Sequence, residues 1–149
     1  MVTLTNHPIQ LSHLGIAEFS FKSTRPPRPS DTVPPDTVEI KINNALNQEH
    51  KELQVSIRAS VGQKDKLEEN LETLPYYFTV RVVGTFHITD KFPMEHVKRW
   101  AEENAPFVIF PYLREIVYSL TTRAGFPPIL LPLVEVPTFQ LDKDSLPDN

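Results

Sequence analysis

Four stretches of this chain alternate apolar and polar side chains, and no helical pattern separates one stretch from the next. A period of two is typical of a strand with one buried face and one solvated face. We expect the four strands at 11–23, 36–45, 51–62 and 75–89. Parallel strands would need long crossover connections, usually helices, and the sequence offers none between them. The pattern therefore predicts one antiparallel sheet with a polar face and an apolar face.

Helical spacing occurs only after the fourth strand, so we expect the helices to cover the apolar face. Pro93 and Pro111 suit the first turn of a helix, where a missing N–H is tolerated, and they predict helices at 93–104 and 111–124. The longer helix repeats apolar residues at i, i+3, i+4 and i+7, namely Leu113, Ile116, Val117 and Leu120. The predicted class is α+β, a four-stranded antiparallel sheet followed by one short and one longer helix. We expect a single domain over 1–149, with flexible ends at 1–10 and 137–149.

The connections are stiff, because the chain has fifteen prolines and only four glycines. Five of the prolines fall in 23–35, which can form neither a helix nor an interior strand. This segment is either a surface linker or a semi-rigid loop that crosses from one strand position to another. The charged connection KDKLEENLE, at 64–72, has room for one helical turn. After the last helix, 126–136 is expected to form an extended apolar strip interrupted by prolines.

The longer helix has more apolar surface than one sheet can cover. Residues 107–110, Tyr112 and Tyr118 add apolar side chains outside the main stripe. A helix that is apolar nearly all round is buried on more than one side, and a chain of 149 residues has little second layer to bury it. The pattern favours a partner subunit. The alternative is that these side chains fill a compact core.

The composition argues against several classes of protein. A net charge of −4 without a basic stripe argues against nucleic-acid binding. The chain has no cysteine for disulfide or thiol chemistry, and its five histidines form no metal-binding motif. It contains no nucleophile motif and no phosphate-binding loop, so we expect no enzyme, no cofactor and no metal. We also find no secretory signal and no apolar run long enough to span a membrane, so a cytoplasmic protein without membrane contact is expected.

One string of residues is specific enough to suggest a family. Phe110-Pro111-Tyr112 is followed by Arg114-Glu115, then by Arg123 and by Phe126-Pro127. This string resembles the core of the bacterial protein-export chaperone SecB, and the match is strongest over 105–133. Upstream, the proline-rich segment falls where SecB has a proline-containing crossover loop.

The resemblance implies an ATP-independent chaperone, a holdase, that binds unfolded or nascent polypeptides through extended hydrophobic grooves for protein export. It also implies no cofactor and a homotetramer built as a dimer of dimers. The apolar side chains expected to bind clients are Val33, Val38, Ile40, Ile42, Phe126, Ile129 and Leu131. Those expected at the oligomer interface are Phe110, Leu113, Ile116, Val117 and Leu120.

The resemblance also suggests two more specific partners. SecB presents acidic residues of its open sheet face to the translocation ATPase SecA, and Glu18 falls at one such position. Lys22 and Thr79 stand at two neighbouring positions, so we expect weaker binding to SecA. The polar tail after Pro137 has no room for a second long helix, a feature shared with SecB-like chaperones of toxin–antitoxin pairs. A dedicated chaperone of an antitoxin or of another single client is therefore the alternative.

Overall fold

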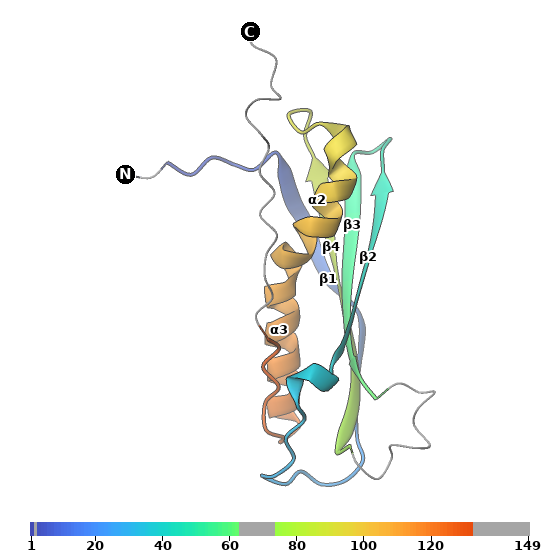
Figure 1. Ribbon diagram of the computed structural model, residues 1–149, viewed down its shortest axis with the longest axis vertical. Coiled ribbons are helices and arrows are strands. Elements are labelled where there is room, and N and C mark those ends of the chain that lie inside the picture. Colours follow the sequence, from blue (N-terminus) through green and yellow to red (C-terminus); the bar gives the residue numbers. More distant parts are fainter. Residues whose placement is uncertain (2, 63–73, 133–149) are drawn as a thin grey trace.

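Four antiparallel strands form one sheet in the computed structural model, which describes residues 1, 3–62 and 74–132. The strands are β1 (Ile9–Ser23), β2 (Glu39–Asn47), β3 (Glu52–Val61) and β4 (Tyr76–Ile88). Their spatial order is β1-β4-β3-β2, so β1 and β2 form the two edges (Figure 1). The predicted antiparallel sheet is confirmed. The charged connection predicted at 64–72 lies outside the described residues.

The proline-rich loop joins the two edges of the sheet. It leaves the end of β1 and reaches β2 through the short 3-10 helix η1 (Pro35–Thr37), so the crossing-loop interpretation is confirmed (Figure 1). The buried Asp31 accepts hydrogen bonds from both Arg25 Nη atoms at 2.5 and 2.6 Å and from the Arg28 N–H at 2.8 Å. The hydrogen bonds from the Arg25 guanidinium hold the pKa of the Asp31 carboxyl below its usual value. These hydrogen bonds of Asp31, here called the Asp31 clip, hold the first half of the loop in place.

The alternation of burial follows the prediction in the centre of the sheet and departs from it at the edge. Every second side chain of β3 and β4 is buried. On β1 a bulge shifts the register between Ile16 and Glu18 and interrupts strict alternation. The segment 1–10, expected to be flexible, reaches into the sheet, since β1 begins at the buried Ile9. The other expected flexible end, 137–149, lies outside the described residues.

Within 89–132, the described part of the chain after the sheet, the helical elements are η3 (Met94–His96), α2 (Val97–Glu103) and α3 (Ala105–Arg123). Both α-helices lie on the apolar face of the sheet, and α3 runs along the strands (Figure 1). The core lies between α3 and the central strands, so the predicted α+β class is confirmed. Among the described residues, no helix is long and apolar enough to cross a membrane.

Helix α3 begins at Ala105, so the prediction that it starts at Pro111 is wrong. Pro106 occupies the first turn, and Pro111 lies inside the helix, where a proline costs about 3 kcal/mol. The earlier start buries Ala105 and Ile109 completely, and the isoleucine alone contributes about 1.5–3 kcal/mol. These two residues extend the buried stripe of Leu113 by steps of four residues. Packing against the sheet therefore outweighs the local preference of proline for a helix start.

Candidate functional site

Helix α3 is narrower than the sheet that it covers. A helix with its side chains is about 10–12 Å wide, whereas the outer strands are about 14 Å apart, three gaps of about 4.8 Å. The helix packs on β3 and β4, where Gly84 gives it room, because a Cβ there would lie 2.8 Å from Ile109 Cγ2. Apolar side chains of both edge strands therefore stay partly uncovered. They are Ile16 and Phe19 on β1, 53% and 55% exposed, and Ile40 and Ile42 on β2, 38% and 49% exposed.

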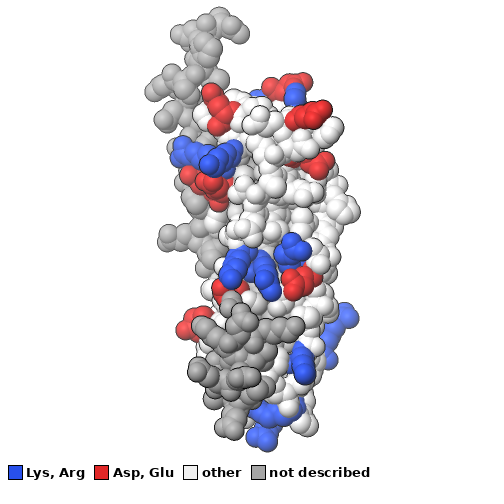
Figure 2. All heavy atoms as spheres, turned by 90° about the vertical axis from the view of Figure 1, so that its right-hand side faces the viewer, with Lys and Arg blue, Asp and Glu red and all other residues white. Residues whose placement is uncertain are grey.

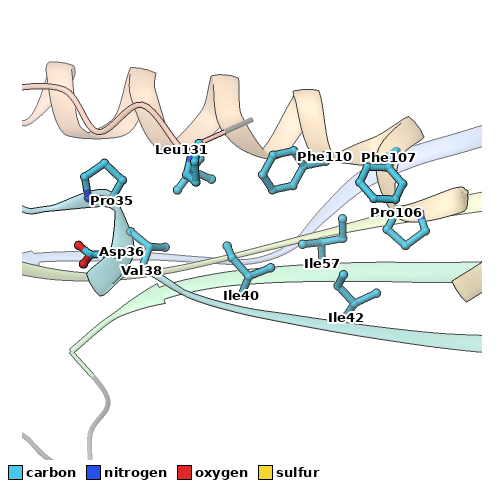
Figure 3. A pocket seen from close by; sticks show the side chains of 11 residues that line it. Pro35, Asp36, Val38, Ile40, Ile42, Ile57, Pro106, Phe107, Phe110 and Leu131 are labelled. Carbon is cyan, nitrogen blue, oxygen red and sulfur yellow. The ribbon is translucent and has the colours of Figure 1, made fainter. Parts of the chain in front are cut away.

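On the β2 side of α3 this uncovered surface forms a groove of about 280 Å³. Figure 3 shows Phe107 and Phe110 projecting from α3 on one side, with Ile40 and Ile42 from β2 facing them. The other lining residues are Pro35, Asp36, Val38, Ile57, Pro106, Leu131 and Pro132. Asp36 is the one charged residue in this lining, so the groove suits apolar side chains.

Residues 126–132 form part of one wall and are here called the apolar strip; 133–136 of the strip predicted at 126–136 lie outside the described residues. The Ile129 N–H donates to Thr121 Oγ1 at 3.1 Å, and Arg114 Nε donates to the Leu131 carbonyl at 2.9 Å. Prolines within the strip remove N–H groups and keep it from pairing as a regular strand. The strip therefore stays extended beside α3, held by two side chains of that helix.

The proline-rich loop between β1 and β2, here called the crossover loop, supplies the opposite wall and leads into β2. Thr37 Oγ1 donates to the Pro34 carbonyl at 2.7 Å and closes the turn of η1. Among the described residues, β2 pairs with β3 alone and so leaves one edge of the sheet unpaired. An unpaired edge beside an apolar groove offers an extended peptide main-chain hydrogen bonds as well as apolar contacts.

The structure divides the predicted client-binding residues into two groups. Those that line the groove are Val38, Ile40, Ile42 and Leu131. Those that are buried without lining the groove are Val33, Phe126 and Ile129, and of the lining residues Val38 and Leu131 are themselves largely buried, at 9% and 1% exposed. The Phe126 ring packs on Tyr76 with 4.7 Å between the ring centroids, which fixes the start of the apolar strip. The buried group therefore supports the walls from behind.

The residues predicted at an oligomer interface fall in three places. Phe110 lines the groove, whereas Leu113 and Val117 are completely buried within the single chain. Ile116 and Leu120 are partly buried against the core. Residues three apart on a helix differ by about 60° around its axis. Leu113 therefore lies between Phe110, on the β2 side of α3, and Ile116, on the β1 side.

Glu18, predicted to contact SecA, lies on the open face of the sheet. It stands opposite Arg81 of β4, and its carboxylate is 3.7 Å from Arg58 Nη2. Lys22 and Thr79 share this face by the alternation of their strands. Cations therefore surround the one acidic residue of that predicted contact.

Sequence reasoning missed several residues that build the groove. Pro106 and Phe107 are missed because the proline rule starts the helix too late. Nothing in the sequence distinguishes Ile57 from the other inward residues of its strand. Thr121 is completely buried and donates to the Val117 carbonyl at 3.0 Å. Its position four residues after Val117, in the buried stripe, is the signal that could have found it.

The site has the properties of a binding surface. Its lining is apolar apart from Asp36, and the edge strand β2 runs along it. The described part of the chain has no group of three or more His, Asp or Glu side chains that could hold a metal ion. Fold and groove together therefore suit the binding of apolar polypeptide segments.

The family follows from a comparison over nearly the whole chain. The model of the SecB family, described as preprotein translocase subunit SecB, matches residues 4–140. The chain belongs to the SecB family, and the resemblance seen in the sequence is confirmed.

Two curated relatives carry the same family name, and a third is uncharacterised. The chain is 28% identical over 131 residues to the protein-export protein SecB of Anaplasma phagocytophilum, covering 80% of this chain and 82% of that one. It is 30% identical over 120 residues to the protein-export protein SecB of Bartonella quintana, covering 76% and 70%. An uncharacterised protein of Methanocaldococcus jannaschii is 30% identical over 99 residues, covering 66% of this chain and 60% of that one.

A solved structure has the same fold. It is the Mycobacterium tuberculosis Rv1957 SecB-like chaperone in complex with a ChAD peptide from the Rv1956 HigA1 antitoxin. The TM-score is 0.64 at 19% sequence identity, and the match covers 88% of this chain and 94% of that chain. At this identity the likeness supports the fold alone.

Proposed function

We propose that this protein is an ATP-independent chaperone, a holdase that binds unfolded or nascent polypeptides in the cytoplasm for protein export. The observation that carries the proposal is the apolar groove, along which Ile40 and Ile42 are exposed on an edge strand. Membership of the SecB family supports the same function, because SecB proteins are export chaperones rather than enzymes.

The groove suits reversible binding of non-native chains. Each apolar client side chain that it covers contributes at most about 1.5–3 kcal/mol. Several such contacts along an extended segment give affinity with little sequence selectivity, and the edge of β2 adds hydrogen bonds that any sequence can make. Binding the unfolded state lowers the free concentration of aggregation-prone chains by mass action. Nucleotide hydrolysis is not needed for binding of this kind.

Light scattering of a chemically denatured client, diluted into buffer with and without the protein, tests this function. The wild type should suppress aggregation at stoichiometric amounts. Ile42→Asp places a charge in the groove and removes an apolar contact of roughly 1.5 kcal/mol, so suppression should need about tenfold more protein. Asn44→Asp adds the same charge to the same strand outside the groove lining and should behave as the wild type. Equal suppression by Ile42→Asp and the wild type would contradict a role of this groove.

A single dedicated client is the second candidate. The solved structure with the same fold contains a SecB-like chaperone bound to an antitoxin peptide, which favours this alternative. Affinity capture from the native organism separates the two. One abundant partner supports a dedicated chaperone, and a spread of precursor proteins supports general export.

Assembly into a homotetramer, a dimer of dimers, is proposed through the β1 side of α3. Ile16 and Phe19 stand opposite buried residues of β4 and so face the helix side of the sheet, yet both are more than half exposed. Ile116 and Leu120 lie partly buried in the same region. Covering such surface contributes about 25 cal/mol per Å², and a closed symmetric oligomer covers it in every copy. A dimer is the simpler form of the same proposal.

Binding to SecA is proposed to be weak. Arg58 lies 3.7 Å from Glu18, and Lys22 and Thr79 replace the other two acidic positions. Charges at the rim of an interface act mainly on the association rate and its salt dependence. Titration of SecA at increasing salt should therefore show a weak complex. A tight complex that salt dissociates would contradict this proposal.

A further inference from the structure

The open face of the sheet carries three cations in one line. Lys41 on β2 stands opposite Arg58 on β3, and Arg58 stands opposite Arg81 on β4. We call these three side chains the cationic row. Figure 2 shows this face of the molecule, with Lys and Arg gathered in its middle and acidic residues beside them. The row is notable in a chain whose net charge is −4.

The sheet itself does not require this arrangement. Like charges directly opposite each other on neighbouring strands are destabilising. The acids nearby balance the row only in part: Glu39 is 3.1 Å from Lys41, and Glu18 is 3.7 Å from Arg58, with side chains about two-fifths to one-half exposed. Exposed pairs of this kind contribute little.

Two donors of the row lack partners. Within the described part of the chain, the Arg81 side chain forms no ion pair and no hydrogen bond. Arg58 Nε is buried without a hydrogen-bond partner there. An arginine with unfilled N–H groups is suited to bidentate contact with a carboxylate. The row therefore combines unbalanced charge with donors that a ligand can fill.

We propose that the cationic row is a docking site for an acidic segment of a partner protein. Adjacent strands are about 4.8 Å apart, and carboxylates one turn apart on a helix are separated by about 5–6 Å. Such a segment can therefore meet the row one carboxylate to one cation. Glu18 and Glu39 flank the row and repel a continuous phosphate backbone, which favours a polypeptide over nucleic acid. The site lies on the face opposite the groove and is independent of client binding.

Fluorescence anisotropy with a labelled oligoglutamate peptide tests the proposal on the full chain. The peptide should bind at low salt, weaken as salt screens the contact, and exceed oligoglutamine in affinity. Arg58→Gln combined with Arg81→Gln should weaken binding about tenfold or more, because both bidentate donors are lost. Lys98→Gln removes the same charge from an exposed site on α2, across the sheet, and should leave binding unchanged.

A melting experiment separates a docking role from a structural one. Arg81→Gln removes a like charge opposite Arg58 and an opposite charge across from Glu18, so its melting temperature should stay close to that of the wild type. Lys41→Gln, at the edge of the sheet, should also fold and bind the peptide more weakly. The proposal is overturned if the double variant binds oligoglutamate as well as the wild type does, if oligothymidylate binds more tightly than oligoglutamate, or if Arg81→Gln unfolds the protein.

Discussion

Apolar side chains are left partly uncovered on both sides of helix α3, but the surroundings of these side chains differ between the two sides. On both sides, an edge strand leaves two apolar side chains that the helix is too narrow to cover, Ile40 and Ile42 on β2, Ile16 and Phe19 on β1. On the β2 side, the crossover loop and the apolar strip turn this surface into a walled groove. On the β1 side, Ile16 and Phe19 stay more than half exposed beside the partly buried Ile116 and Leu120. The loop and the strip, which form walls on the β2 side, therefore distinguish the two sides.

The presence or absence of walls beside the uncovered apolar side chains determines which kind of partner each side of α3 can bind. A groove takes an extended segment, because it encloses side chains from more than one direction and offers an edge for main-chain pairing. A flat apolar surface is best covered by another flat surface, as a second copy of the chain provides. We therefore infer client binding on the β2 side and assembly on the β1 side from one fold and one helix.

A substitution at Gly84, where α3 packs on the sheet, should have the largest effect, because the surfaces on both sides of the helix depend on its position. In Gly84→Val the new Cβ would meet Ile109 Cγ2 at 2.8 Å, and the helix must move away from the sheet. We expect a loss of about 1–3 kcal/mol in the free energy of unfolding, with weaker client binding and weaker assembly together. Urea denaturation measures the loss. Gly15→Ala is the control, since a Cβ there meets only His13 Nε2, at 3.6 Å, and stability should change little.

A charge on the β1 side should affect assembly alone. Phe19→Asp removes a side chain that is 55% exposed in the single chain, so the monomer should stay folded. We expect sedimentation equilibrium to show dissociation of the tetramer into a dimer, or into a monomer near 17.1 kDa, while aggregation of a client is still suppressed. Ser20→Asp adds the same charge next along β1, on the open face, and should leave the oligomer intact. Assembly that survives Phe19→Asp would count against the proposed interface.

Loosening one wall of the groove should have a smaller effect, confined to the β2 side. Asp31→Asn removes the charge that clips the crossover loop to Arg25. The pKa of Asp31 is lower in the folded chain, so the clip stabilises the fold above the unfolded value of about 3.9 and is lost as pH falls through the folded value. Thermal melts across the acid range should show a steeper fall for the wild type than for the variant. Identical pH profiles would show that the clip contributes nothing.

The sequence predicted the sheet well because strand periodicity is a local property. Alternation alone predicts the four strands and their inward faces. The prolines between the first two strands predict a stiff loop that crosses from one strand position to another. The start of α3 could not be predicted this way. Pro111 is tolerated inside the helix only because Ile109 and its neighbours pack on the sheet, and that gain is tertiary.

The candidate site was predictable only in part, because burial at a groove depends on what stands beside it. Ile42 and Ile129 look alike in sequence, as apolar residues in extended segments. In the structure Ile42 is 49% exposed, because α3 covers the central strands and does not reach over β2. Ile129 is 2% exposed, because the hydrogen bond from its N–H to Thr121 holds the strip against the helix. The difference in exposure depends on the width of one helix relative to four strands, which no local sequence pattern predicts.

Site-specific photo-crosslinking tests the division between the two sides most directly. A benzoylphenylalanine can replace Phe110 in the groove or Phe19 on the β1 side, since both sites already hold an aromatic ring. With an unfolded client present, position 110 should capture the client, and position 19 should capture a second copy of the chain, giving a band at twice 17.1 kDa. Client captured at position 19, or a second copy captured at position 110, would contradict the account.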